Sequence, residues 1–283
     1  MGLAKVKIRF WNVVSCTNRQ LLEQMEAWRK TNGHHLVCFC DANGLAHGWR
    51  ESDVQNAYRK ADAVVADGIA IKWLVRISGG KLPERIFGPS LFLRAMEYGI
   101  PLGWRHFLYG GASGVAEELK RRMEARFPGV QIIGADAPPF SSDPPIPNGD
   151  RPRKDGDRPY DFLWVALGSP KQEKWCAQHL AELNASVVLP VGAAFDFHTD
   201  RAPRAPQWVD AVGLCWLWRL LTGGRRVFKR NIWCLPRAAL ILIKEFLRIK
   251  IFQSDIRPAI TTSEDIDYAE LRAKQDLARK LNV

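Results

Sequence analysis

The sequence has 283 residues, 47% hydrophobic and 25% charged, so it is long and apolar enough to fold around a sizeable core. This composition excludes a disordered or a fibrous protein. The six cysteines form no C-x-x-C pair and no closely spaced Cys/His set, which argues against a zinc site and a disulfide framework. Scattered thiols are typical of a reducing cytosol.

The net charge of +11 is unevenly distributed along the chain. Between positions 204 and 250, ten Lys and Arg residues accompany two acidic residues. The N-terminus lacks the basic stretch, apolar run and cleavage site of a secretory signal, so we expect no export. The apolar run at 238–243 is far shorter than the roughly 20 residues that span a bilayer. We therefore expect a protein that does not cross a membrane.

Up to about residue 200, short apolar runs alternate with helical patterns, which predicts an α/β fold with a Rossmann-like parallel sheet. The predicted strands cover 36–40, 63–65, 106–109, 130–133, 162–166 and 187–191. The predicted helices cover 19–30, 53–60, 90–97, 115–127 and 171–182.

The segment 137–159 interrupts this alternation. It holds seven prolines and a charged run without helical period, which predicts a surface loop. Asp155 and Asp157 within it match the D-x-D pattern with which many glycosyltransferases hold a metal. No apolar strand presents the pair, and Lys154 and Arg158 compete for the carboxylates. We therefore predict no metal site and no cofactor.

After residue 200 the sequence becomes rich in tryptophan and in basic residues, with an amphipathic helical pattern. Aromatic and aliphatic groups on one helix face and cations on the other are typical of a helix in a membrane interface, although a helix docked on its own core has the same pattern. We therefore divide the chain into an α/β core (1–200), a membrane-binding helical appendage (201–252) and a charged C-terminal helix or tail (253–283).

Several turns follow predicted strands, at the edge where parallel sheets bind ligands. Gly110 and Gly111 begin a glycine-rich turn into a helix, a geometry that lets backbone N–H groups approach a phosphate. Asp67 follows the predicted strand at 63–65 and is placed to accept a proton from a sugar hydroxyl. Asn43 falls at the same edge, and Gln172 opens a helix after a fourth turn, where it is able to bind a sugar or a base.

Taken in order, these segments resemble the WecG/TagA/CpsF family of bacterial glycosyltransferases. The resemblance runs from about Leu36 to Arg230. It rests on Asn43 and on the motifs ADGIAI (66–71), ERIFG (84–88), YGGASG (109–114), LGSPKQE (167–173), VGAAFDF (191–197), RAPQW (204–208) and GLCWLWRLL (213–221).

The resemblance implies an inverting, metal-independent hexosyltransferase that uses a UDP-sugar donor and an undecaprenyl-diphosphate-linked sugar acceptor. It makes Asp67 the general base and assigns the stabilisation of the departing diphosphate to Arg219 and Arg226. The substrate-binding residues that it implies are Asn43, Arg85, Gly110, Gly111, Gln172, Gly192, Asp196, Lys229 and Arg230. We expect the protein to lie on the inner face of the cytoplasmic membrane, with an anionic lipid surface as a partner. We expect no nucleic acid partner, and a homo-oligomer is possible.

The sequence departs from the family pattern at several positions. Asp41 replaces a usual threonine, Ser90 an aspartate, Cys215 a glutamate, and Gly223-Gly224 a Glu-Pro pair. These changes make the family's sugar specificity unsafe to transfer. Three other interpretations remain: an NAD-dependent oxidoreductase, for which the glycine spacing is wrong; a basic protein that binds nucleic acid or membrane without catalysis; and an inactive family member that acts as a scaffold.

Overall fold

The structure is a computed structural model that describes residues 3–147, 159–203, 205–206, 209 and 215–256. The chain divides into two compact units, residues 1–243 and residues 244–283. The first unit contains the sheet and all of the site described below. In the second, the described residues continue a helix as far as Ile256.

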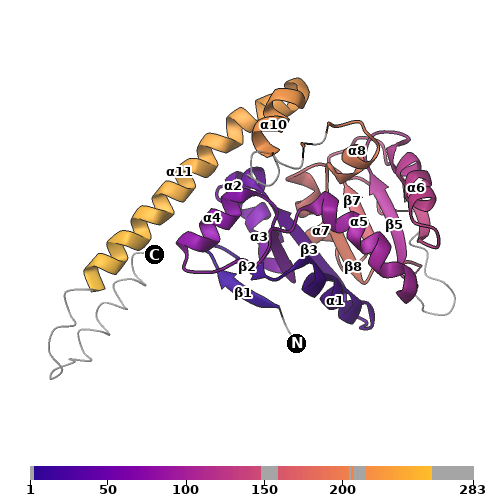
Figure 1. Ribbon diagram of the computed structural model, residues 1–283, viewed down its shortest axis with the longest axis horizontal. Helices are drawn as coiled ribbons and strands as arrows, with labels where there is room; N and C mark the ends of the chain where they lie inside the picture. The colour runs from indigo at the N-terminus through magenta and orange to yellow at the C-terminus, as the bar shows by residue number, and fades with distance from the viewer. Residues whose placement is uncertain (1–2, 148–158, 204, 207–208, 210–214, 257–283) are drawn as a thin grey trace. The chain divides into compact units, whose positions relative to one another are not determined.

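A six-stranded parallel sheet with the order β4-β3-β8-β7-β5-β6 forms the centre of the first unit (Figure 1). Its strands are β3 (His35–Cys40), β4 (Ala63–Ala66), β5 (Arg105–Gly110), β6 (Gln131–Asp136), β7 (Phe162–Ala166) and β8 (Val187–Pro190). All six were predicted within a few residues, and the predicted α/β class is confirmed.

Helices cover both faces of this sheet, because strand residues that point to opposite faces belong to two separate apolar clusters. One cluster joins the sheet to α1 (Asn18–Arg29), α5 (Gly88–Gly99), α6 (Val115–Arg126) and α8 (Ala194–His198). The other joins it to α2 (Ala42–Gly48), α3 (Ser52–Lys60), α4 (Ile69–Ile77) and α7 (Lys171–His179).

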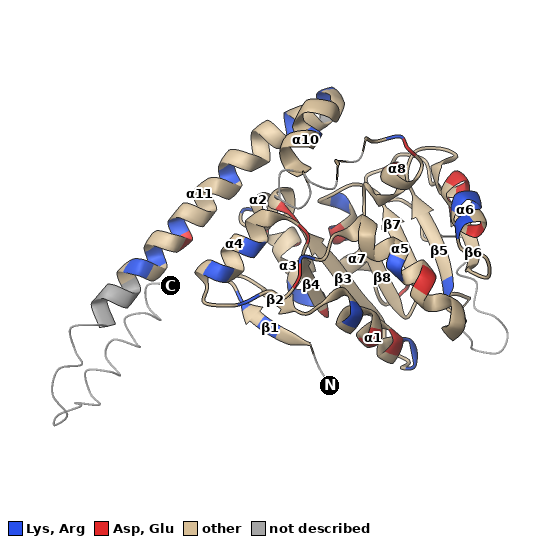
Figure 2. Cartoon of the chain, viewed as in Figure 1, with Lys and Arg blue, Asp and Glu red and all other residues tan. Residues whose placement is uncertain are grey.

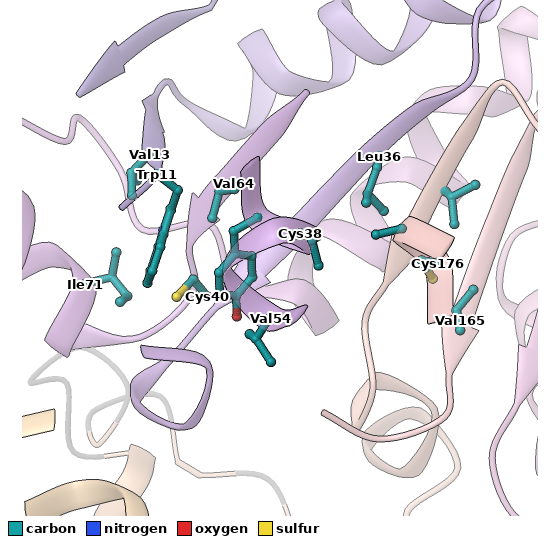
Figure 3. Close-up of a cluster of buried hydrophobic side chains, with 14 of the residues drawn as sticks. Trp11, Val13, Leu36, Cys38, Cys40, Val54, Val64, Ile71, Val165 and Cys176 are labelled. Atoms are coloured by element: carbon teal, nitrogen blue, oxygen red, sulfur yellow. The ribbon is translucent and has the colours of Figure 1, made fainter. Parts of the chain in front are cut away.

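The second cluster has an aromatic end, where Trp11 lies near Cys40, Val64 and Ile71 (Figure 3). Trp11 follows the first strand of the hairpin β1 (Ala4–Lys7) and β2 (Asn12–Ser15), which pair antiparallel. The hairpin was not predicted, because each strand has four residues and β1 is mostly exposed. Its strands therefore show neither a continuous apolar run nor a clear alternation.

Among the described residues, α10 (Cys215–Thr222) and α11 (Gly224–Ile256) follow the core, in the region where the sequence predicts a helical appendage. The turn between them requires glycine. A Cβ on Gly223 would lie 2.4 Å from the carbonyl oxygen of Arg219, and Gly224 has a φ of +70°. Ala238 and Ile241 of α11 are buried in the same cluster as α3, α4 and α7. The division at residue 200 into core and membrane-binding appendage concerns function and stays a prediction.

The proline-rich segment is described for 137–147 and for Pro159, and these residues form no helix or strand, as predicted. Part of it packs on the core, because Trp175 Nε1 donates to the carbonyl of Pro144 at 2.9 Å. Asp155 and Asp157, the residues of the D-x-D pattern, lie outside the described residues. So does the predicted tail from residue 257 onward.

Candidate active site

A cavity of about 680 Å³ lies in the first unit at the carboxyl ends of β3 and β4. Asp41 follows β3 and Asp67 follows β4, and the last residues of the two strands, Cys40 and Ala66, are register partners. The polar residues of its lining include Asp41, Asn43, Asp67, Arg85, Ser90, His198, Arg219, Arg230 and Asn231. We call this cavity the Asp67 cleft.

Asp67 is held at the floor of this cleft by backbone hydrogen bonds. Its N–H donates to the carbonyl of Cys40 at 3.0 Å, and its Oδ1 accepts from the N–H of Gly88 at 3.4 Å. Burial and the neighbouring Asp41 carboxylate raise the pKa of Asp67 to about 7, against the opposing effects of Arg85, the Gly88 N–H and Arg219. A carboxyl group with this pKa is suited to accept a proton near neutral pH.

Asn43 is almost completely buried in the first turn of α2 and lines the same cleft as Asp67. Its Nδ2 donates to Ser169 Oγ at 3.4 Å, which links the turn after β3 to the turn after β7. Its Oδ1 is buried and accepts no hydrogen bond from any described residue. Because an unsatisfied buried acceptor is costly, this oxygen is suited to accept a hydrogen bond from a substrate.

Three arginines from different segments complete the polar end of the cleft. Arg85 precedes α5, and its guanidinium lies 5.5 Å from the centre of the Phe87 ring. Arg219 comes from α10 and lies over Phe197 at 5.3 Å, with its pKa lowered by burial and then by Arg230. Arg230 comes from α11, and its Nε is buried with no hydrogen-bond partner among the described residues. Together they suit an anion with several oxygens, such as a diphosphate.

The other predicted site residues in the core lie above different strands. Gly110 ends β5 and Gly111 follows it, with φ values of +106° and +86°. A Cβ on Gly110 would lie 2.6 Å from the carbonyl oxygen of Ala166. Their turn leads to α6, whose first residue is preceded by Gly114 without a side-chain cap. An uncapped helix N-terminus is suited to bind an anion, and the binding of a phosphate there stays a prediction.

Gln172 is buried and supports a neighbouring turn. Its Oε1 accepts from the N–H of Gly168 at 3.2 Å, while its Nε2 donates to the carbonyl of Pro190 at 3.1 Å and to Glu173. Gly192 has a φ of +53°, and a Cβ there would lie 3.2 Å from the Gln172 amide. Gln172 therefore shapes the ends of β7 and β8, and a direct contact with a sugar or base stays a prediction.

The remaining predicted site residues are Asp196, Lys229 and Arg226, and none of them is among the described residues that line the Asp67 cleft. Asp196 lies in α8, where its carbonyl accepts from the N–H groups of Arg201 and Ala202. Lys229 is exposed on α11. Arg226 is helical, and its side chain lies outside the description. Within the described ranges, no three His, Cys, Asp or Glu side chains cluster in a way that would hold a metal ion.

Sequence reasoning missed several residues of the cleft. Asp41 drew attention as a departure from the family pattern but not as a site residue. On α11, the predicted Arg230 is joined in the cleft lining by residues that were not predicted and that recur at helical spacing: Asn231, Cys234, Leu235, Ala238, Ala239 and Leu242. That periodicity is visible in the sequence and marks the helix face that lines the cleft.

The sequence profile of the glycosyl transferase WecG/TagA/CpsF family matches residues 6–251. The chain is 26% identical over 203 residues to the N-acetylglucosaminyldiphosphoundecaprenol N-acetyl-beta-D-mannosaminyltransferase of Bacillus subtilis (strain 168), covering 72% of this chain and 77% of that one. A protein of the same name from Bacillus spizizenii is 28% identical over 184 residues, covering 65% of this chain and 69% of its own. The chain is therefore a hexosyltransferase and belongs to the WecG/TagA/CpsF family of glycosyltransferases.

Proposed function

We propose that the enzyme transfers a hexosyl or N-acetylhexosaminyl unit from a UDP-sugar to an undecaprenyl-diphosphate-linked sugar, with inversion and without a metal ion. The two relatives carry names that specify an undecaprenyl-diphosphate-linked acceptor. The observation that carries the proposal is a carboxylate with a pKa near 7 that shares one cleft with three arginines.

In the proposed reaction, a hydroxyl group of the acceptor sugar attacks the anomeric carbon of the donor. The new C–O bond forms as the bond from the anomeric carbon to the diphosphate breaks, and Asp67 takes the hydroxyl proton. A single displacement of this kind inverts the anomeric centre. The diphosphate leaves with additional negative charge, which Arg219, Arg230 and Arg85 stabilise.

The strand order suggests how the nucleotide lies. Parallel strands are about 4.8 Å apart, so the glycine turn after β5 lies roughly 19 Å along the sheet edge from the end of β4, which Asp67 follows. The glycine turn is therefore too far from Asp67 to hold the phosphate next to the reacting carbon. We place the nucleoside towards Gly110, Gly111 and Gly192, and the diphosphate and sugar in the Asp67 cleft.

The test is the release of UDP from a panel of UDP-hexoses and UDP-N-acetylhexosamines, with vesicles that carry a polyprenyl-diphosphate-linked sugar. We expect release that requires the acceptor, and a β-linked or α-linked product opposite in configuration to the donor. NMR of the product reports the configuration. Retention of the donor configuration would contradict the single displacement, and turnover that stops on addition of a chelator would contradict metal independence.

The mouth of the cleft supports a lipid-linked acceptor. Trp73 of α4 and Trp216 of α10 line the cleft and are 51% and 38% exposed. Tryptophan at the edge of an apolar cleft is suited to the headgroup region of a membrane. No helix in the part of the chain that the structure describes carries an apolar stretch long enough to cross a bilayer.

Helix α11 adds exposed apolar side chains to a basic segment. In the first unit these are Phe228, Ile232, Leu240 and Ile243, and Figure 2 shows Lys and Arg along the same helix. Apolar groups beside cations favour insertion into an anionic lipid surface. We therefore propose that the enzyme works as a peripheral protein on the inner face of the cytoplasmic membrane.

Replacing Ile232 and Leu240 together by Asp is expected to lower binding to anionic vesicles by about tenfold or more, because two apolar side chains would no longer enter the lipid. Sedimentation with vesicles at several salt concentrations measures the effect. The matched control is Ile133→Asp on β6, since Ile133 is 49% exposed and Ile232 is 54% exposed. Equal binding of all three proteins would refute the role of α11.

A further inference from the structure

Asp41 and Asp67 form a fixed pair of carboxylates on the floor of the cleft. They follow adjacent strands whose last residues are register partners, and the N–H groups of Asp67 and Gly68 both donate to the carbonyl of Cys40, at 3.0 and 3.4 Å. The two backbones are in close contact, because a Cβ on Gly68 would lie 3.2 Å from the Cα of Asp41. The close approach is therefore built into the sheet.

Each carboxylate is also tied to a backbone N–H group. Asp41 Oδ1 accepts from the N–H of Gly44 at 2.8 Å and caps the N-terminus of α2. Asp67 Oδ1 accepts from the N–H of Gly88. Within the described residues, Asp41 Oδ2 and Asp67 Oδ2 accept no hydrogen bond. Both side chains line the cleft. The pair thus presents two carboxylate groups to a substrate at a fixed separation.

We propose that Asp41 is a positioning residue for sugar transfer, whose negative charge beside Asp67 makes Asp67 a stronger base and helps to hold Arg219 at the cleft. The inference rests on the proposed function, because it requires Asp67 to act as the base. A role in capping α2 alone would need no charge, since Asn caps a helix as well as Asp does.

The charges around Asp67 explain why a second carboxylate is useful. Arg85 faces it from the segment before α5, Arg219 from α10 and Arg230 from α11, while Cys40 lies behind it in β3. Arg85 and Arg219 lower the pKa of Asp67, whereas burial and Asp41 raise it. Without the Asp41 charge, the arginines that suit a diphosphate would also make Asp67 a weaker base. In this proposal, the Asp41 charge keeps Asp67 a strong enough base although the arginines that bind the diphosphate lie nearby.

The carboxylates of Asp41 and Asp67 also interact electrostatically with Arg219. Burial and Arg230 lower its pKa, and Asp41 and Asp67 oppose that effect. Nearby negative charge offsets the free-energy cost of partly burying the Arg219 guanidinium before the substrate binds.

The test compares Asp41→Asn, which keeps the cap and the shape, with Asp41→Glu, which keeps the charge. In the wild type, kcat/KM should rise with pH and level off above the pKa of Asp67. In Asp41→Asn the midpoint of this rise should move about one pH unit lower, and kcat above it should fall several-fold. Asp41→Glu should return the midpoint towards that of the wild type. An unchanged midpoint in Asp41→Asn overturns the inference.

A second measurement does not depend on turnover. NMR titration of the full chain with ¹³C-labelled aspartate, with Asp67→Asn to assign the signal, gives the pKa of Asp67 directly. We expect a lower pKa of Asp67 in Asp41→Asn, with a Tm at pH 8 that is no lower than that of the wild type. An unmoved Asp67 titration contradicts the role of Asp41, whereas full turnover by Asp67→Asn contradicts the proposed function itself. The two failures are therefore distinguishable.

Discussion

Replacing Asp67 by Asn is expected to lower kcat/KM by about 10²–10⁴-fold, the usual contribution of a general base. The amide has nearly the shape of the carboxyl group and is able to accept from Gly88, but it cannot take the proton of the attacking hydroxyl. Binding of UDP should change little, because the proposed nucleoside contacts lie at other strands. Acceptor-dependent UDP release and calorimetric titration of UDP measure the two effects separately.

The pH dependence gives an independent check of Asp67. Because its pKa is about 7, kcat/KM of the wild type should fall about tenfold per pH unit below that value and level off above it. The fold binds this proton more tightly than the unfolded chain does, so the native carboxyl destabilises the fold as pH rises from about 4 to 7. Asp67→Asn should therefore have a Tm equal to or above that of the wild type at pH 8. A lower Tm there, with lost activity, would point to a structural role.

Most of the sheet was predictable because each central strand is an apolar run bounded by turn residues. Leu163 and Trp164 illustrate why, since they belong to clusters on opposite faces and both are completely buried. The strand order was not predictable. β7 and β8 come last in the sequence but lie between β3 and β5, and local pattern carries no information about such an insertion.

Asp67 and Asn43 were predictable for the same reason, since each directly follows a recognisable strand. Arg219 and Arg230 were implied by the family resemblance alone, because they reach the cleft from helices far along the chain. The sequence predicted the glycine turn after β5 as part of the site, but not Asp41. A glycine-rich turn has a recognisable composition, whereas the pairing of Asp41 with Asp67 depends on strand register.

Helix α4 shows a different limit. It begins two residues after Asp67, and its sequence IAIKWLVRI has a strong apolar face formed by Ile71, Leu74 and Val75. This helix was not predicted, because it is short and follows an Asp-Gly pair, and such a short apolar run is also compatible with a turn followed by a strand. Packing of its apolar face onto the sheet decides in favour of the helix.

Replacing Arg219 by Ala is expected to lower kcat by about 10²–10³-fold, as removal of one group that stabilises developing charge does in other enzymes. Arg219 lies in the cleft with Asp67 and is half-buried, so water screens its charge less than that of an exposed arginine. The donor KM should change less than kcat, because the diphosphate gains charge as it departs. Steady-state UDP release at saturating acceptor measures both constants.

Two variants make this prediction specific. Arg219→Lys keeps the charge but loses the planar group that binds two oxygens at once, so it should recover only part of the lost kcat. Arg19→Ala removes an arginine whose side chain is 85% exposed on α1 and should leave kcat unchanged. If Arg219→Ala raised KM alone and left kcat intact, Arg219 would bind the ground state and transition state equally. The stabilisation of the leaving diphosphate would then fall to Arg85 and Arg230.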